Sequence, residues 1–214
     1  MHLASRTALA ACTLLLTIPT AFADSLVLRD DFSKPSSGWP DNGRDASRSK
    51  GFATYTPTGK YQMTPTQDNT YGIMTAPRQA ASGDVRIDAT LFLYAGLGRG
   101  GAGVVCRYRD HDNFYAFIAT GAPGWIVMKV ANGKATSLAQ GRLPAGVMAG
   151  AVDAKLSAEC TGDTLRLSVD GREVGRARDA TFAGGSTGLL VMGEQAAGTS
   201  ATFDNFTLKD VSGR

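Results

Sequence analysis

Short runs of β-branched and aromatic residues, separated by Gly, Pro, Asn and Asp, follow one another along nearly the whole chain after residue 24. No stretch keeps the apolar period of an amphipathic helix. Runs of this length and spacing are typical of an antiparallel β-sandwich or barrel. We therefore expect an all-β protein, with strands at 26–32, 52–56, 60–64, 71–75, 84–94, 102–109, 113–119, 125–130, 152–160, 164–169, 173–177, 187–192 and 201–208.

Two dipeptides predict tight turns between neighbouring antiparallel strands. Asn132-Gly133 and Asp170-Gly171 favour the two-residue hairpin turn, because both of its positions need positive φ. The segment 164–169 alternates polar and apolar residues, so one face of that strand should be buried and the other exposed. No Pro-rich linker, shift in composition or internal repeat divides the chain. We expect a single domain over residues 24–214.

The N-terminal segment has the three parts of a secretory signal peptide. Arg6 supplies the cation, residues 8–18 form an apolar run, and Ala21-Phe22-Ala23 forms the small-x-small cleavage site. The apolar run is too short to span a membrane, which needs about 20 apolar residues. We expect residues 1–23 to be a signal peptide and the protein to be secreted or periplasmic, without a membrane span.

Cysteine usage fits an exported protein. Of the three cysteines, Cys12 would be removed with the signal peptide, which leaves Cys106 and Cys160. Thiols oxidise in the compartments that exported proteins enter, so we predict one disulfide between these two residues, on adjacent strands of the sandwich. The alternative is a pair of buried free thiols.

The charge balance argues against nucleic acid as a partner. The chain has 22 basic and 19 acidic residues, and the basic ones are dispersed along it. Binding driven by counterion release from phosphates needs a basic stripe or patch, and the sequence shows none.

Several motifs together resemble the LamG-like jelly rolls of the concanavalin A-like lectin/glucanase superfamily. They are LRDDF at 28–32, SSGW at 36–39, Tyr61, GVVCRYRD at 103–110, NFY at 113–115, ECTGDTL at 159–165, VDG at 169–171 and FDNF at 203–206. The resemblance implies a two-sheet antiparallel sandwich, or jelly roll. It leaves function open, because lectins, glycoside hydrolases, lyases and adhesion domains share this architecture.

The alternation of side chains between the two faces of a strand predicts a candidate binding face. If Cys106 points into the core, Arg107 should point outward, since neighbouring strand residues face opposite ways. Tyr115, Trp125 and Lys129 could then form the neighbouring rows of that face, with both rings at least partly exposed. Rings that stack on sugars and cations that donate to hydroxyls predict a carbohydrate groove. The alternative is that these rings belong to the core.

The sequence lacks the residues of known glycan-cleaving sites in this architecture. Glycoside hydrolysis normally needs two facing carboxylates, which glucanases of this fold carry as Glu-x-Asp-x-x-Glu. Glu159, Glu173 and Glu194 do not form that motif, and His111 is the only histidine after residue 23. We expect a carbohydrate-binding module without catalytic activity. Its alternatives are a structural or protein-interaction domain of the cell envelope and an unconventional glycan hydrolase or lyase.

Two further residues have expected roles. Asp204 is a candidate ligand for a structural calcium ion, because related jelly rolls often hold one where the strands from the two chain ends pair. No other cofactor is expected. Trp39 follows a turn near the N-terminus and is expected to be a structural plug.

Overall fold

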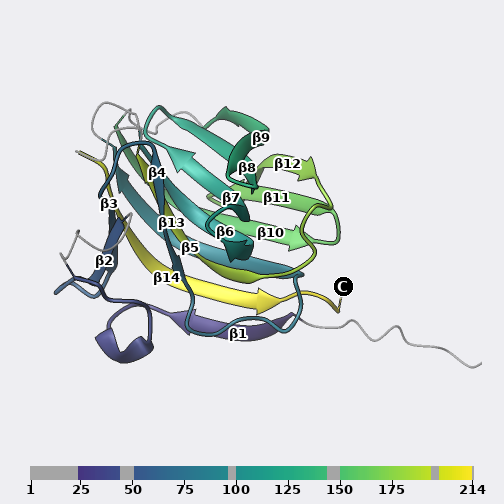
Figure 1. Ribbon diagram of the computed structural model, residues 1–214. Coiled ribbons are helices and arrows are strands. Elements are labelled where there is room, and N and C mark those ends of the chain that lie inside the picture. The colour runs from purple at the N-terminus through teal and green to yellow at the C-terminus, as the bar shows by residue number, and fades with distance from the viewer. Residues whose placement is uncertain (1–23, 44–50, 96–99, 144–149, 194–197, 214) are drawn as a thin grey trace, which may run out of the picture.

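Two antiparallel sheets face each other and enclose the hydrophobic core (Figure 1). The computed structural model describes residues 24–43, 51–95, 100–143, 150–193 and 198–213. The predicted signal peptide at residues 1–23 lies outside the described residues.

Sheet A has eight strands in the order β12-β11-β10-β5-β14-β3-β2, with β1 added beside β14. Its strands are β1 (Ser25–Asp30), β2 (Gly51–Tyr55), β3 (Tyr61–Pro65), β5 (Val85–Tyr94), β10 (Ala151–Thr161), β11 (Thr164–Val169), β12 (Arg172–Arg178) and β14 (Ser200–Asp210). The first and last strands of the domain therefore lie side by side, as the purple and yellow arrows of Figure 1 show.

Sheet B has six strands in the order β4-β13-β6-β7-β8-β9. Its strands are β4 (Thr70–Thr75), β6 (Gly100–Asp110), β7 (Asn113–Thr120), β8 (Gly124–Ala131), β9 (Lys134–Arg142) and β13 (Ser186–Gly193). A short 3-10 turn, η1 (Pro35–Ser37), follows β1. The predicted all-β, two-sheet antiparallel sandwich is confirmed.

All thirteen predicted strands are present, and the fourteenth, β9, is the one that the sequence did not predict. Its residues are mostly exposed and few of them are β-branched or aromatic. β9 forms because the turn at Asn132 and Gly133, with φ of 52° and 74°, returns the chain alongside β8. The turn at Asp170 and Gly171 likewise has positive φ at both positions. Both hairpin predictions are confirmed.

Alternating side chains of both sheets build the core. In β5, Ile87, Ala89, Leu91 and Leu93 are buried, while the residues that alternate with them point to solvent. Trp39, which follows the turn after β1, is buried against this core, as predicted. Its ring packs edge-on against Phe206, with centroids 4.9 Å apart, and its Nε1 donates to Asp30 Oδ2 at 3.0 Å.

The predicted disulfide between Cys106 and Cys160 is present, but it joins the two sheets and does not link adjacent strands of one sheet. Cys106 lies in β6 of sheet B and Cys160 in β10 of sheet A, with Cα atoms 6.9 Å apart. Both residues are fully buried. The bond therefore fixes the two layers to each other across the core.

Candidate functional site

The prediction that Tyr115 and Trp125 are solvent-exposed is wrong. Tyr115 is 0% exposed and Trp125 is 8% exposed. Tyr115 lies opposite Cys106 in the β6–β7 pairing, so its side chain shares the inward direction of Cys106. Trp125 packs in the same core cluster. Neither ring offers a surface to a ligand.

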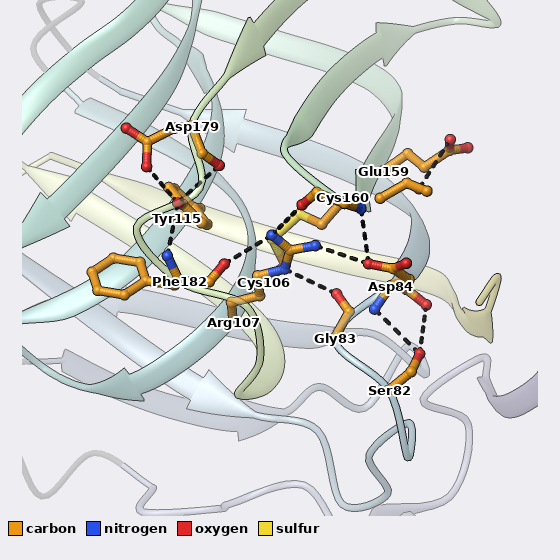
Figure 2. Close-up of a disulfide and its surroundings, with 12 residues drawn as sticks. Ser82, Gly83, Asp84, Cys106, Arg107, Tyr115, Glu159, Cys160, Asp179 and Phe182 are labelled. Carbon is orange, nitrogen blue, oxygen red and sulfur yellow. Dashed lines mark hydrogen bonds and ion pairs between the residues drawn. A yellow bond between two sulfur atoms is a disulfide. The ribbon is translucent and has the colours of Figure 1, made fainter.

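Arg107 is also buried, at 1% exposure, because β6 does not keep its alternation. Its φ of 51° and the register break after Cys106 form a β-bulge, which directs Arg107 inward like its neighbour. Figure 2 shows the guanidinium between three chain segments. It donates to Gly83 O at 3.0 Å, and to Gly162 O and Phe182 O at 2.8 Å each. Arg107 therefore holds the two sheets together beside the disulfide.

Lys129 and Tyr115 do come together, on the carboxylate of Asp179. Tyr115 Oη donates to Asp179 Oδ1 at 2.6 Å, and Lys129 Nζ forms an ion pair with Asp179 Oδ2. Tyr115 Oη also accepts a hydrogen bond from the backbone N of Phe182 at 3.1 Å. These contacts attach the segment between β12 and β13 to the inner side of sheet B, which is a structural role.

The Asp179 cluster predicts acid sensitivity. Burial raises the pKa of Asp179, but hydrogen bonds from Lys129, Thr181 and Tyr115 outweigh it and lower the pKa well below its ordinary value. A carboxyl whose pKa is lower in the folded state stabilises the fold above its unfolded pKa of about 3.9 and loses this contribution as the pH falls.

We expect Asp179→Asn to lower the free energy of unfolding at pH 7 by about 2 kcal/mol, as for a hydrogen bond to a charged group. Denaturant titrations at pH 7, 5 and 3 measure the effect. The variant should lose less stability than the wild type between pH 5 and pH 3. Equal losses in the two proteins would contradict this role of Asp179.

The surroundings of Asp204 do not fit the expected calcium ion. Asp204 Oδ2 lies 3.1 Å from the ammonium group of Lys60, and Oδ1 accepts the backbone N of Asn205 at 2.7 Å. Both carboxylate oxygens of Asp204 therefore already have partners, one of them a cation. Among the described residues, no group of three or more His, Cys, Asp or Glu side chains could hold a metal ion.

The outer face of sheet B is apolar but packed. Val105, Phe114, Ala116, Ile118 and Leu190 are fully buried there in a second cluster, separate from the main core. A Cβ added at Gly101 would lie 2.7 Å from Ile118 Cγ2, so side chains of the neighbouring strands already cover this glycine. These residues form a buried apolar layer on the outer face of sheet B.

The outer face of sheet A carries exposed aromatic rings. Phe92 and Tyr94, two residues apart on β5, are 49% and 55% exposed. Phe92 lies between Asp153 of β10 and Thr202 of β14, and Tyr94 lies next to Ser200. Gln62 of β3 pairs with Thr202. We call Phe92, Tyr94 and these polar neighbours the aromatic patch.

A shallow pocket of about 660 Å³ continues the aromatic patch over β2 and β3. Phe52, Thr54, Pro57, Gln62 and Thr64 contribute to its walls. Gln62 belongs to both regions, and its Nε2 donates to Ser200 Oγ at 3.1 Å. The surface therefore combines apolar rings with hydroxyl and amide groups that donate and accept hydrogen bonds.

The sequence contained a signal for this patch that the prediction missed. In β5 the polar residues Arg86, Asp88 and Thr90 alternate with buried apolar ones. Phe92 and Tyr94 occupy the next positions on the same face as these polar residues, because side chains of a strand alternate between its two faces. Their exposure follows from that position.

Comparison with protein-family models and with curated protein sequences finds no match. Solved structures do match. The carbohydrate-binding module CBM66 from Bacillus subtilis is 23% identical with a TM-score of 0.62, over 81% of this chain and 96% of that one. The exoplasmic/lumenal domain of VIP36, in a form bound to Ca²⁺ and Man, is 14% identical with a TM-score of 0.56, over 76% and 82%.

These matches, with the two-sheet topology, decide the fold. The chain has a concanavalin A-like jelly-roll fold. Xylan β-1,4-xylosidase from Bacillus halodurans C-125 also matches, at 17% identity and a TM-score of 0.62, over 85% of this chain but only 38% of the xylosidase. The concanavalin A-like fold is thus shared with both binding modules and enzymes, and the LamG-like subtype stays a prediction.

On the outer face of sheet A of this concanavalin A-like sandwich, three carboxylates are held in ion pairs. Asp204 pairs with Lys60, Asp88 with Arg86 at 3.1 Å, and Glu159 with Arg166 at 3.7 Å. Asp153, beside Phe92, is exposed.

Within the residues described, no helix has the length and apolar character of a membrane span.

Proposed function

We propose that this protein is an exported carbohydrate-binding module without catalytic activity, and that the aromatic patch is its glycan site. The observation that carries the proposal is the exposure of Phe92 and Tyr94 on one strand of a rigid sheet. Large exposed apolar side chains that lie together often mark binding surfaces. The likeness to CBM66 and to the Man-bound domain of VIP36 supports a glycan as the ligand.

The chemistry of the patch suits a sugar. Aromatic rings offer flat apolar surfaces to the C–H faces of pyranose or furanose rings. The amide of Gln62 and the hydroxyl groups of Ser200 and Thr202 can exchange hydrogen bonds with sugar hydroxyls. Since β5 pairs with a strand on each side, the rings are held on a rigid scaffold, which keeps the entropic cost of binding low.

Export is supported by the cross-sheet disulfide, because disulfides persist mainly in oxidising compartments. Glycoside hydrolysis requires one protonated carboxyl group as the acid and one carboxylate as the base or nucleophile. Asp88, Glu159 and Asp204 are each in an ion pair with a cation, which favours the ionised form of all three, and this supports the absence of catalysis. Reducing-end and unsaturated-product assays on β-glucans and uronans should therefore stay at background.

A glycan array probed with the wild-type protein would first identify a ligand. Phe92→Ala and Tyr94→Ala should each weaken binding to that ligand about tenfold, by analogy with the roughly 1–3 kcal/mol of one stacked base. Isothermal titration calorimetry measures the affinities. The melting temperature should hardly change, because both side chains are about half exposed.

The matched control is Leu26→Ala, which removes another exposed apolar side chain, 53% exposed, from β1, a strand that pairs with β14 and not with β5. It should leave glycan affinity unchanged. Full affinity in both aromatic variants would refute the aromatic patch as the site, and an array without any bound glycan would favour a structural or protein-interaction role.

A further inference from the structure

A second groove on the outer side of sheet A is lined by cations. Its volume is about 840 Å³, larger than the pocket beside the aromatic patch. We call it the cationic groove. Its walls include Arg29 of β1, Lys34 and Ser36 around η1, Arg78 after β4, and Asn205 and Thr207 of β14.

Among the described residues, none of the three cations of this groove is held in a salt bridge, although the charge of Lys34 acts on the nearby carboxylate of Asp31. Arg29, Lys34 and Arg78 are exposed, and no ion pair involves them within the part of the chain that the structure describes. The groove carries three cations against the two carboxylates of Asp30 and Asp31, and its two arginines are not held in salt bridges with any described residue, which favours an anionic ligand. Arginine in particular binds carboxylate and sulfate oxygens through two parallel hydrogen bonds.

The two carboxylates that also line the groove are engaged elsewhere. Asp30 is 7% exposed and accepts hydrogen bonds from Trp39 Nε1 at 3.0 Å and from the backbone N of Phe32 at 2.8 Å. Asp31 accepts from Ser33 Oγ at 2.6 Å and from the backbone N of Ser33 at 3.0 Å. Neither carboxylate is therefore positioned by an arginine of the groove.

The cationic groove lies on the same face as the aromatic patch. Arg29 is opposite Thr207 of β14, while Phe92 is opposite Thr202 of the same strand. Thr207 lies opposite Asp88, four residues of β5 from Phe92, so the two regions are about 13 Å apart along the strands and about 10 Å apart across β14.

A shallow depression of about 530 Å³ over β5 and β10 borders the cationic groove at Asn205, and its lining includes Thr90, two residues before Phe92 on β5. The exposed Lys155 also lines the depression, and Asn205 lines both the depression and the groove. Asn205 reaches both because it sits at the β14 register break with φ of 51°, which turns its side chain outward. One extended chain of sugars can therefore follow this face from one region to the other.

We propose that the cationic groove binds a carboxylate or sulfate group of an acidic glycan whose sugar rings lie on the aromatic patch. The inference rests on the proposed function and names its ligand class. Arg29 and Arg78 hold the anionic group, and Lys34 adds positive charge at the edge of the groove.

Isothermal titration calorimetry would compare polygalacturonate, dextran sulfate, uncharged dextran and inorganic sulfate as probes. We expect the wild type to bind one of the two acidic polymers more tightly than dextran. The double variant Arg29→Ala/Arg78→Ala should lose at least tenfold in affinity for that polymer, which corresponds to about 1.4 kcal/mol. The melting temperature should be retained, since both side chains are exposed.

The matched controls are Arg142→Ala and Arg172→Ala, which remove exposed arginines of β9 and β12 outside the groove. Combined, they change the net charge by the same amount as the double variant and should leave affinity unchanged. An equal loss in this control would mean non-specific attraction and would overturn the proposal. Binding of inorganic sulfate with no preference for an acidic polymer would also overturn it, because the groove would then bind small anions only.

Failure of this inference and failure of the proposed function give different results. If a neutral glycan binds, needs Phe92 and Tyr94, and is unaffected by the arginine variants, the proposed function stands and the acidic-glycan inference is wrong. If Phe92→Ala and Tyr94→Ala leave every polymer affinity unchanged, the proposed site itself is wrong.

Discussion

Replacing Trp125 with alanine should lower the free energy of unfolding by about 3–5 kcal/mol, the range for truncating a buried aromatic side chain. The indole lies where the edges of the two sheets meet. A Cβ added at Gly175 of β12 would be 2.3 Å from Trp125 Cζ3, and one at Gly141 of β9 would be 2.7 Å from Cζ2. Both glycines therefore make room for the ring, which fills the space between the two edge strands.

Thermal unfolding followed by circular dichroism would test this. For a domain of this size the melting temperature should fall by about 6–20 °C, at roughly 2–4 °C for each kcal/mol. Phe92→Ala is the matched control, because it removes an aromatic ring from an exposed position and should shift the transition little. A Trp125→Ala protein that melts like the wild type would contradict the core position of the indole.

A second large effect is expected when the cross-sheet disulfide is removed. Cys106 and Cys160 are separated by 54 positions in the sequence. Closing a loop of that length restricts the unfolded chain by about 4 kcal/mol at 25 °C. The Cys106→Ala/Cys160→Ala protein should therefore be less stable by about that amount, as measured by guanidinium denaturation.

The fold itself should survive this change under mild conditions. Arg107, next to Cys106, still donates to Gly162 O, two residues after Cys160, and to Phe182 O (Figure 2). Wild-type protein treated with a reductant provides the control, because it loses the bond without losing side-chain volume. Mass spectrometry of unreduced digests should find the two cysteines in one linked peptide, and separate peptides with free thiols would disprove the bond.

The candidate site could be predicted from the sequence only in part. The alternation of Arg86, Asp88 and Thr90 with buried residues already assigns Phe92 and Tyr94 to the exposed face. The cationic groove, by contrast, gathers Arg29, Arg78 and Asn205 from distant parts of the chain. Only the pairing of β1 with β14 and the position of the segment after β4 bring these residues together.

The sequence by itself determined the all-β class, the two hairpin turns and every strand that the structure describes except β9. A period of two residues and the backbone preferences of Asn-Gly and Asp-Gly act over a few neighbouring residues, so they can be recognised without tertiary contacts. Export from the segment 1–23 stays a prediction of the same local kind. β9 lacks such a local signal, and its strand conformation depends on its pairing with β8.

Only the tertiary structure decided which way the side chains of Arg107 and Tyr115 point. The bulge at Arg107 inverts the alternation of β6, and the pairing of Tyr115 with Cys106 directs the tyrosine ring into the core. A shift of one residue exchanges the two faces of a strand, and whether it occurs depends on hydrogen bonds to a partner strand that can be far away in sequence. Alternation therefore separates the two faces locally, whereas the packing of the sheets decides which face is buried.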